Sequence, residues 1–201
     1  MNAGFAIRET ERLSPTLTRL VVEAPLVARK RQAGHFVIVR ATDTGERIPL
    51  TIVDGSPQEG TITLIVQAVG RTTRLLCGLR PGQELRDVVG PLGNPTPMHR
   101  WGRVACVGGG VGTAVVYPIA RALRAAGNEV HSVVGARSRD LLVLEREMGA
   151  CSDSLVVTTD DGSRGRAGLV TGPLRERLEA GGLEAVYAIG PLPMMMAVCD
   201  L

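Results

Sequence analysis

The sequence predicts two domains of different architecture: an antiparallel β-barrel over residues 1–98, followed by a parallel-sheet α/β domain over residues 101–201. Three observations predict this division. Short β-type runs separated by turn residues fill the first half, whereas strand and helix patterns alternate in the second. Between them lies Asn94–Met98, a stretch rich in turn-forming residues. A chain of 201 residues is long enough for both domains.

Composition excludes several classes of protein. Apolar residues make up 44% of the chain and charged residues 21%, a balance typical of globular proteins rather than disordered ones. Aromatic residues make up only 2%, which argues against a nucleic-acid binder that stacks bases on aromatic rings. The net charge of +3 is too small to indicate nucleic-acid binding. The densest basic run, Arg29–Arg31, is interpreted as a solvated loop or strand edge.

Cysteine spacing and hydropathy bear on metal sites and on localisation. Cys77, Cys106, Cys151 and Cys199 are too far apart to form a motif that binds a metal or an iron–sulfur cluster. Cys106 lies in an apolar run and is expected to be a buried strand thiol. The N-terminus has no signal-peptide pattern, and no apolar run is long enough to span a membrane. We therefore expect a cytoplasmic protein that binds no metal, nucleic acid or membrane.

The first half is expected to form five or six short antiparallel strands with almost no helix. The expected strands are 17–23, 36–40, 47–53, 60–66 and 84–89. Pro49 within the third run indicates a strand edge or a bulge, where backbone groups are free to face a ligand.

The second half is expected to form four parallel strands joined by right-handed helical crossovers. Strands are expected at 103–107, 129–134, 155–159 and 185–189, and helices at 112–126, 140–148, 171–180 and 194–201.

A run of glycines, Gly108–Gly112, lies between the first of these strands and the following helix. Glycines at this position let the backbone approach a phosphate, which the helix N-terminus attracts. The strict G-x-G-x-x-G pattern is not satisfied, and no acidic residue ends the next strand. The run is therefore compatible with a dinucleotide loop or with a simple tight turn.

Two further loops are expected at the carboxyl edge of the same sheet, where ligands bind in such folds. One contains Asp160 and Asp161, which could bond ribose hydroxyl groups or cap their own turn; the other is Gly190–Met196. Arg137 and Arg139, which follow the second strand, suit a 2′-phosphate or a pyrophosphate, or are solvated. Together, the three loops predict a dinucleotide crevice.

In the barrel, Gly70–Thr73 combines a glycine, a cation and two hydroxyl groups at the start of a short helix, which suits a pyrophosphate. Ordinary turn chemistry also explains it. No Ser/His/Asp or Cys/His nucleophile set is apparent, and His131, within an expected strand, is interpreted as structural.

Seven motifs in this order resemble the ferredoxin–NADP reductase-like flavoproteins. The resemblance is closest to the small FAD subunit of NADH-dependent reduced ferredoxin:NADP oxidoreductase and of sulfide dehydrogenase, and extends to the electron-transfer subunit of dihydroorotate dehydrogenase. The motifs are 47–52, 69–73, 89–93, 107–112, 135–137, 159–163 and 189–195.

The resemblance implies that FAD lies against the barrel and that a pyridine nucleotide binds the α/β domain. FAD-binding positions would be Arg47, Pro49, Leu50, Thr51, Val66, Gln67, Gly70, Arg71, Thr72 and Thr73. Thr51 would lie closest to the reactive ring nitrogen and is the catalytic candidate. Nucleotide-binding positions would be Gly109, Gly110, Val111, Gly112, Thr113, Arg137, Asp161, Gly190, Pro191 and Met194.

The implied function is hydride transfer between NAD(P)H and FAD, with NAD(H) preferred over NADP(H). Electrons would then pass to a larger flavin and iron–sulfur subunit or to a ferredoxin. The family normally adds a cysteine-rich segment that binds a 2Fe–2S cluster. None of the four cysteines here matches those ligands, so we expect a truncated chain, a lost cluster or a partner that supplies the route for electrons.

Three other functions remain open. The chain could be a non-catalytic assembly subunit of a larger flavin–iron–sulfur complex, or a stand-alone NADP-dependent ferredoxin or flavodoxin reductase. A glycine loop after a strand also suits S-adenosylmethionine, as in methyltransferase-like proteins, although the barrel motifs argue against this.

Overall fold

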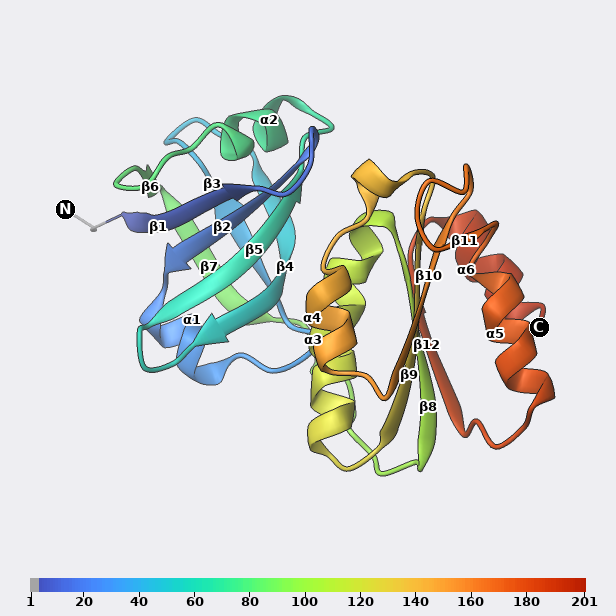
Figure 1. Ribbon diagram of the computed structural model, residues 1–201. Coiled ribbons are helices and arrows are strands. Elements are labelled where there is room, and N and C mark those ends of the chain that lie inside the picture. Colours follow the sequence, from blue (N-terminus) through green and yellow to red (C-terminus); the bar gives the residue numbers. More distant parts are fainter. Residues whose placement is uncertain (1–3) are drawn as a thin grey trace. The chain divides into compact units, whose positions relative to one another are not determined.

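A computed structural model describes residues 4–201 and confirms the predicted fold class. The chain divides into two compact units, the first ending at Thr96 and the second beginning at Pro97. The first contains a seven-stranded antiparallel sheet that curves into a barrel, and the second contains a five-stranded parallel sheet (Figure 1). Among the described residues, no helix is long and apolar enough to cross a membrane.

The barrel sheet has the strand order β6-β1-β2-β5-β4-β3-β7. Its strands are β1 (Phe5–Arg12), β2 (Leu17–Glu23), β3 (Phe36–Arg40), β4 (Arg47–Ser56), β5 (Thr61–Gln67), β6 (Glu84–Leu85) and β7 (Asp87–Leu92). β1 was not predicted, because charged residues dominate its sequence and hide the alternation. Two of these, Arg8 and Glu11, form ion pairs with Glu23 and Arg19 on β2, so the charged side chains of β1 lie on the outer face of the barrel.

Two short helices accompany the barrel, α1 (Pro25–Lys30) and α2 (Arg71–Cys77). The helix predicted after Gly70 is present as α2. The interpretation of Arg29–Arg31 as a loop or strand edge is wrong, because Arg29 and Lys30 form the last turn of α1. Cations are favoured there by the helix dipole. Arg31 caps the helix, and its guanidinium contacts Asp54 at 2.8 Å.

The barrel interior is filled by aliphatic side chains from all of the longer strands. Leu20, Ile52 and Leu64 lie on three neighbouring strands and are fully buried in one cluster. Burying such side chains is the main source of the stability of this unit.

Leu64→Ala should lower the free energy of unfolding of the barrel unit by about 2–5 kcal/mol, because it leaves a cavity in a close-packed core. Leu26, which is 71% exposed, provides the matched control, and Leu26→Ala should change stability by less than about 0.5 kcal/mol. Denaturant unfolding followed by circular dichroism measures both. Similar losses for the two variants would contradict this placement of the core.

The parallel sheet has the order β11-β10-β9-β8-β12. Its strands are β8 (Arg103–Gly109), β9 (Glu129–Ala136), β10 (Ser154–Thr159), β11 (Arg166–Ala167) and β12 (Ala185–Ile189). The helices α3 (Thr113–Ala125) and α4 (Glu145–Ala150) cover one face, and α5 (Thr171–Glu179) and α6 (Leu192–Cys199) cover the other (Figure 1).

The continuous helix predicted over 140–148 is wrong. A 3₁₀ turn, η2 (Arg139–Leu141), comes first, and α4 begins only at Glu145. Between them, Leu144 adopts a φ of 56°, a left-handed conformation that a continuous right-handed helix cannot contain.

Candidate functional site

The parallel sheet contains a topological switch point at β8. From β8 the chain runs to β9 and β10 on one side, and it later returns to place β12 on the other side. In open α/β sheets, the crevice for ligands lies at the carboxyl ends of the strands on either side of such a point. Here those ends are Gly109 on β8 and Ile189 on β12.

The glycine loop links β8 to α3 through the 3₁₀ turn η1 (Gly110–Gly112). A Cβ added to Gly109 would lie 2.4 Å from the Met194 sulfur, and one on Gly112 would lie 2.4 Å from the Ile189 carbonyl oxygen. These two positions need glycine because the loop after β12 packs directly against them. The glycines therefore serve, in part, to join the two loops at the switch point.

Gly110 differs from its neighbours. Its φ is +54°, and a Cβ built on it would meet no atom within 4 Å. The left-handed backbone requires glycine, while the open space leaves the peptide accessible. Gly110 is therefore the position in this loop where a ligand can approach the backbone. Val111 beside it is partly exposed, whereas Thr113 is buried at the start of α3.

The loop after β12 supplies the other side of the switch point. Pro191 is exposed, and the Met194 side chain is half-buried against Gly109 and Gly190. A Cβ on Gly190 would lie 3.2 Å from the Gly109 Cα, so the two backbones are close together. The structure thus brings together the predicted positions from 109–113 and from 190–194.

The loops after β9 and β10 are also joined. The Asp161 N–H donates to the Arg137 carbonyl at 3.2 Å, and the Asp160 N–H donates to Ala136 at 3.1 Å. The Arg137 side chain is exposed. Arg137 and Asp161 therefore lie next to each other at the carboxyl edge of the sheet.

Asp161 uses its carboxylate within its own turn. Its Oδ1 accepts the Ser163 hydroxyl at 2.6 Å and the Ser163 N–H at 3.0 Å. The hydroxyl bond and then the N–H bond lower the pKa of Asp161, so the exposed carboxylate is ionised at neutral pH. The turn-capping alternative for this residue is present in the structure.

Ser163→Ala should raise the pKa of Asp161 towards its ordinary value, because the hydrogen bond that lowers this pKa most is lost. A carboxylate whose pKa is lower in the folded state than in the unfolded state stabilises the fold at pH values above the unfolded-state pKa. This stabilisation is lost as the pH falls through the folded-state pKa. In the variant, the free energy of unfolding should therefore lose the pH-dependent contribution that the Asp161–Ser163 hydroxyl bond makes. Titration of the Asp161 carboxyl resonance by NMR measures the shift, and an unchanged pKa would contradict the assignment.

On the barrel, the strand β4 presents two different faces. Arg47, Pro49 and Thr51 alternate on the outer face, while Leu50 packs against the interior cluster. Arg47 is anchored by Asp87, 3.3 Å away on β7. Of the four predicted positions on this strand, three share an accessible face, and Leu50 offers only its backbone to that face.

The segment from β5 to α2 carries the remaining predicted positions. The Val66 side chain is fully buried in the barrel interior, and Gln67 at the end of β5 is half-buried. Gly70 precedes α2, and a Cβ built on it would meet only the Thr73 hydroxyl, at 4.0 Å. Gly70 therefore leaves an open approach to the backbone at the start of α2.

The two threonine hydroxyls of α2 already have protein partners. Thr73 Oγ1 accepts the Gly70 N–H at 2.8 Å, and Thr72 Oγ1 donates to the Glu46 carboxylate at 2.6 Å. Arg71 is exposed beside them. Sequence reasoning missed Glu46, although its position directly before Arg47 was a signal that it could reach this site.

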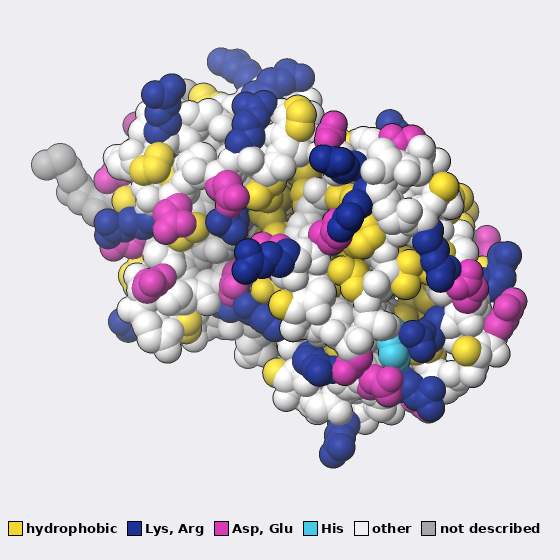
Figure 2. Space-filling model, in the orientation of Figure 1, with side chains coloured by type: hydrophobic (Ala, Val, Ile, Leu, Met, Phe, Trp, Pro, Cys, Tyr) yellow, Lys and Arg dark blue, Asp and Glu magenta, His cyan; other side chains and the backbone are white. Residues whose placement is uncertain are grey.

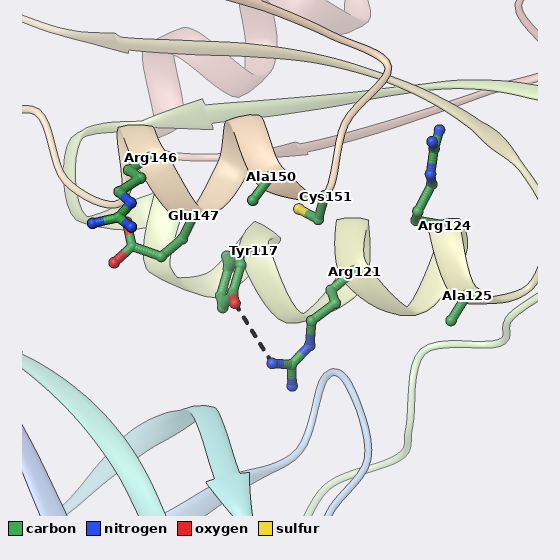
Figure 3. A pocket seen from close by; sticks show the side chains of 8 residues that line it. All are labelled: Tyr117, Arg121, Arg124, Ala125, Arg146, Glu147, Ala150 and Cys151. Carbon is green, nitrogen blue, oxygen red and sulfur yellow. Dashed lines mark hydrogen bonds between the residues drawn. The ribbon is translucent and has the colours of Figure 1, made fainter.

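A groove on the second unit lies between α3 and α4 and has a volume of about 550 Å³ (Figure 3). Arg121 donates to the Tyr117 hydroxyl at 3.5 Å and also lies over its ring, while Arg124 is paired with Asp153. Sequence reasoning gave this groove no role; the only signal was the i, i+4 spacing of Tyr117 and Arg121. In Figure 2, basic and acidic side chains are intermixed over much of the visible face, and several Lys or Arg side chains gather at its top.

The described residues contain no group of three or more His, Cys, Asp or Glu side chains that could hold a metal ion. All four cysteines are free. Burial raises the pKa of Cys106 to about 12, and the nearby Cys151 adds to this, so the thiol stays protonated as expected for a buried strand residue.

Comparison with known proteins gave related chains but no matching family model. The chain is 43% identical over 180 residues to the "Dihydroorotate dehydrogenase B (NAD(+)), electron transfer subunit homolog" of Thermotoga maritima, covering 90% of this chain and 63% of that protein. It is 35% identical over 206 residues to the corresponding electron transfer subunit of Bacillus caldolyticus, covering 94% and 78%.

Solved structures with the same fold belong to related reductases. The structure reported for NADH-dependent reduced ferredoxin-NADP oxidoreductase matches with a TM-score of 0.90 and 39% identity, over 97% of this chain and 70% of that one. Phthalate dioxygenase reductase matches with a TM-score of 0.79 at 20% identity, over 98% and 63%, which supports the shared fold.

Proposed function

The chain belongs to the ferredoxin reductase-like flavoproteins that include the electron-transfer subunits of dihydroorotate dehydrogenase B, and on that premise we propose that it passes a hydride between a pyridine nucleotide and FAD. The observation that carries the proposal is the open, left-handed Gly110 at the switch point of a parallel sheet. Electrons would then move to a partner protein, as the subunit names of the relatives suggest.

The barrel residues fit FAD. The outer face of β4 offers Arg47, Pro49 and Thr51, and the open backbone at Gly70 suits a pyrophosphate beside the exposed Arg71. When bound, FAD supplies the redox chemistry of accepting a hydride and releasing electrons onward. We assign Thr51 as the residue nearest the flavin ring, with its hydroxyl as the polar group on that face.

Arg47 would orient the cofactor. Because Asp87 holds its guanidinium at the edge of β4, the cation is pre-positioned and loses little freedom on binding a phosphate. Leu50, Val66 and Gln67 would contribute through their backbone and strand position. Thr72 and Thr73 would shape the loop, since Glu46 and Gly70 already hold their hydroxyls.

The switch-point residues fit a dinucleotide. Gly110 and Val111 would face the phosphates, with Gly109, Gly112, Gly190 and Met194 setting the distance between the two loops. Thr113 would start α3 beneath them, and Pro191 would lie at the rim. Arg137 and Asp161 would contact the adenosine end. NAD(H) is preferred by the resemblance, and the Asp161 carboxylate suits a ribose hydroxyl.

The iron–sulfur cluster of related proteins has no fitting ligand set among the described residues. The proposed onward acceptor is a larger flavin and iron–sulfur subunit or a ferredoxin.

Titration with FAD, followed by anaerobic mixing with NADH and with NADPH, tests the proposal. We expect FAD to bind at the barrel and NADH to reduce it faster than NADPH. Faster reduction by NADPH would instead favour a stand-alone NADP-dependent reductase. Failure to bind FAD, both alone and with a co-purified partner, would support the assembly-subunit function and contradict the proposal.

A further inference from the structure

A cluster of polar side chains lies at the amino ends of β9 and β10, at the opposite end of these strands from the dinucleotide loops. Ser154 is the first residue of β10 and pairs with His131 on β9. Its hydroxyl lies 2.7 Å from His131 Nδ1, and Glu129 Oε1 lies 3.1 Å from Nε2 of the same ring. Serine, histidine and glutamate thus form one chain of contacts.

The His131 ring is held between Ser154 and Glu129. His131 is 7% exposed, and with Nε2 directed at a carboxylate, the neutral tautomer that satisfies both contacts carries its proton on Nε2. Nδ1 then accepts from the serine hydroxyl. Nε2 makes no hydrogen bond with any described residue, so Glu129 acts on the ring mainly through its charge.

Two arginines complete the surroundings. Arg177 of α5 donates to Ser154 Oγ at 3.2 Å, and Arg103 at the start of β8 lies 3.8 Å from Glu129. Burial, and then Arg177, lower the pKa of His131 below its usual 6.5, while Glu129 opposes the shift. The imidazole is therefore neutral at pH 7, the state in which it can accept a proton.

We propose that Ser154, His131 and Glu129 act as a nucleophile, base and orienting acid that react with small activated esters. Nucleophile–base–acid chains of this kind are recognised by geometry rather than by sequence order. Ser154 is half-buried at the amino end of β10. Arg177, which lies beside the serine, would supply a cation near the carbonyl oxygen of the ester, where negative charge develops.

The reaction balances without a redox partner. Ser154 Oγ attacks the ester carbonyl carbon and its proton passes to His131 Nδ1. The ester C–O bond breaks, and the leaving alcohol takes that proton, which leaves an acyl group on Ser154. A water molecule then attacks the acyl carbon by the reverse proton route, releasing the acid and the free serine.

Treatment of the whole protein with an alkyl fluorophosphonate tests the nucleophile, because the serine oxygen displaces fluoride and keeps the phosphonyl group. Ser56, whose hydroxyl accepts a turn N–H from Glu59, is an internal control in the same sample. We expect Ser154 to be labelled at least about 100-fold faster than Ser56, the usual lower range for general-base catalysis. Peptide mass spectrometry measures both. Equal labelling would overturn the proposal.

Two variants distinguish a reactive Ser154 from one whose hydrogen bonds only hold the structure together. His131→Gln should slow labelling at Ser154, and Ser154→Ala should remove the corresponding release of p-nitrophenolate from p-nitrophenyl acetate. In the wild-type protein, the labelling rate should be independent of pH near neutrality and fall in the acidic range, because the pKa of His131 lies below its usual value. Labelling without hydrolysis that depends on Ser154 would overturn the esterase assignment.

Discussion

Replacement of Gly112 by Ala should abolish most pyridine-nucleotide binding and destabilise the second unit. Gly112 has an ordinary φ of −60°, so the substitution creates no backbone strain. Its Cβ, however, would lie 2.4 Å from the Ile189 carbonyl oxygen and 2.8 Å from the Gly190 Cα. Because both are backbone atoms, the two loops must separate, at a cost of about 1–3 kcal/mol in the free energy of unfolding.

The matched control is Gly172→Ala, in α5 of the same unit. A Cβ there meets nothing within 4 Å, and alanine is favoured over glycine in a helix by up to about 1 kcal/mol. Thermal unfolding and an NADH titration measure the two effects. We expect Gly112→Ala to weaken NADH binding by about tenfold or more and the control to leave it unchanged. Equal NADH affinity in both variants would contradict the placement of the nucleotide at the switch point.

Gly70→Ala should weaken FAD binding without weakening the fold. The backbone at Gly70 is extended, with φ of −128° and ψ of −177°, and the space for a Cβ is open. Alanine therefore fits the folded protein. If the FAD pyrophosphate lies against this backbone, the added methyl group displaces it, and we expect the FAD dissociation constant to rise about tenfold or more, or about 1.4 kcal/mol.

Gly78→Ala, at the opposite end of α2, is the control for this substitution. Its Cβ would make ordinary contacts, the nearest with the Leu75 carbonyl at 3.4 Å. FAD affinity from fluorescence titration, with thermal unfolding of the FAD-free protein, separates binding from folding. A lower melting temperature for Gly70→Ala with normal FAD affinity would show that this glycine serves the fold and not the cofactor.

Most strands could be predicted because their apolar patterns are strong. β8 reads as an almost continuous apolar run, as buried parallel strands do, and β9 is equally buried although it contains His131 and Ser132. β1 was missed because its outward-facing residues are charged and Ile7 is its one buried side chain. α1 was missed because a helix of six residues carries too little periodicity, and the break at Leu144 depends on a single dihedral angle.

The candidate site could be located from sequence but not resolved into roles. The order of strand, glycines and helix placed the loop correctly, yet only the structure separates Gly110, open to a ligand, from Gly112, packed against a loop 77 residues later. Hydrogen bonds between side chains could not be predicted from the sequence either. Spacing could not reveal that Ser163 holds Asp161, or that Glu46 holds Thr72.

The Ser154 cluster could not be predicted from the sequence either, because its contacts do not depend on spacing along the chain. Its residues come from two strands and a helix, and their proximity depends on the register that pairs Ser154 with His131. The interpretation of His131 as a lone structural residue did not include these partners.

The most direct measurement is the visible absorption spectrum of the FAD-loaded protein, recorded without oxygen before and after addition of NADH. We expect a flavin spectrum that bleaches on addition, because the proposal places FAD against the barrel and the reductant at the switch-point loops. A protein that takes up no flavin, or a bound flavin that neither NADH nor NADPH bleaches, would contradict hydride transfer between pyridine nucleotide and FAD as the function of this chain.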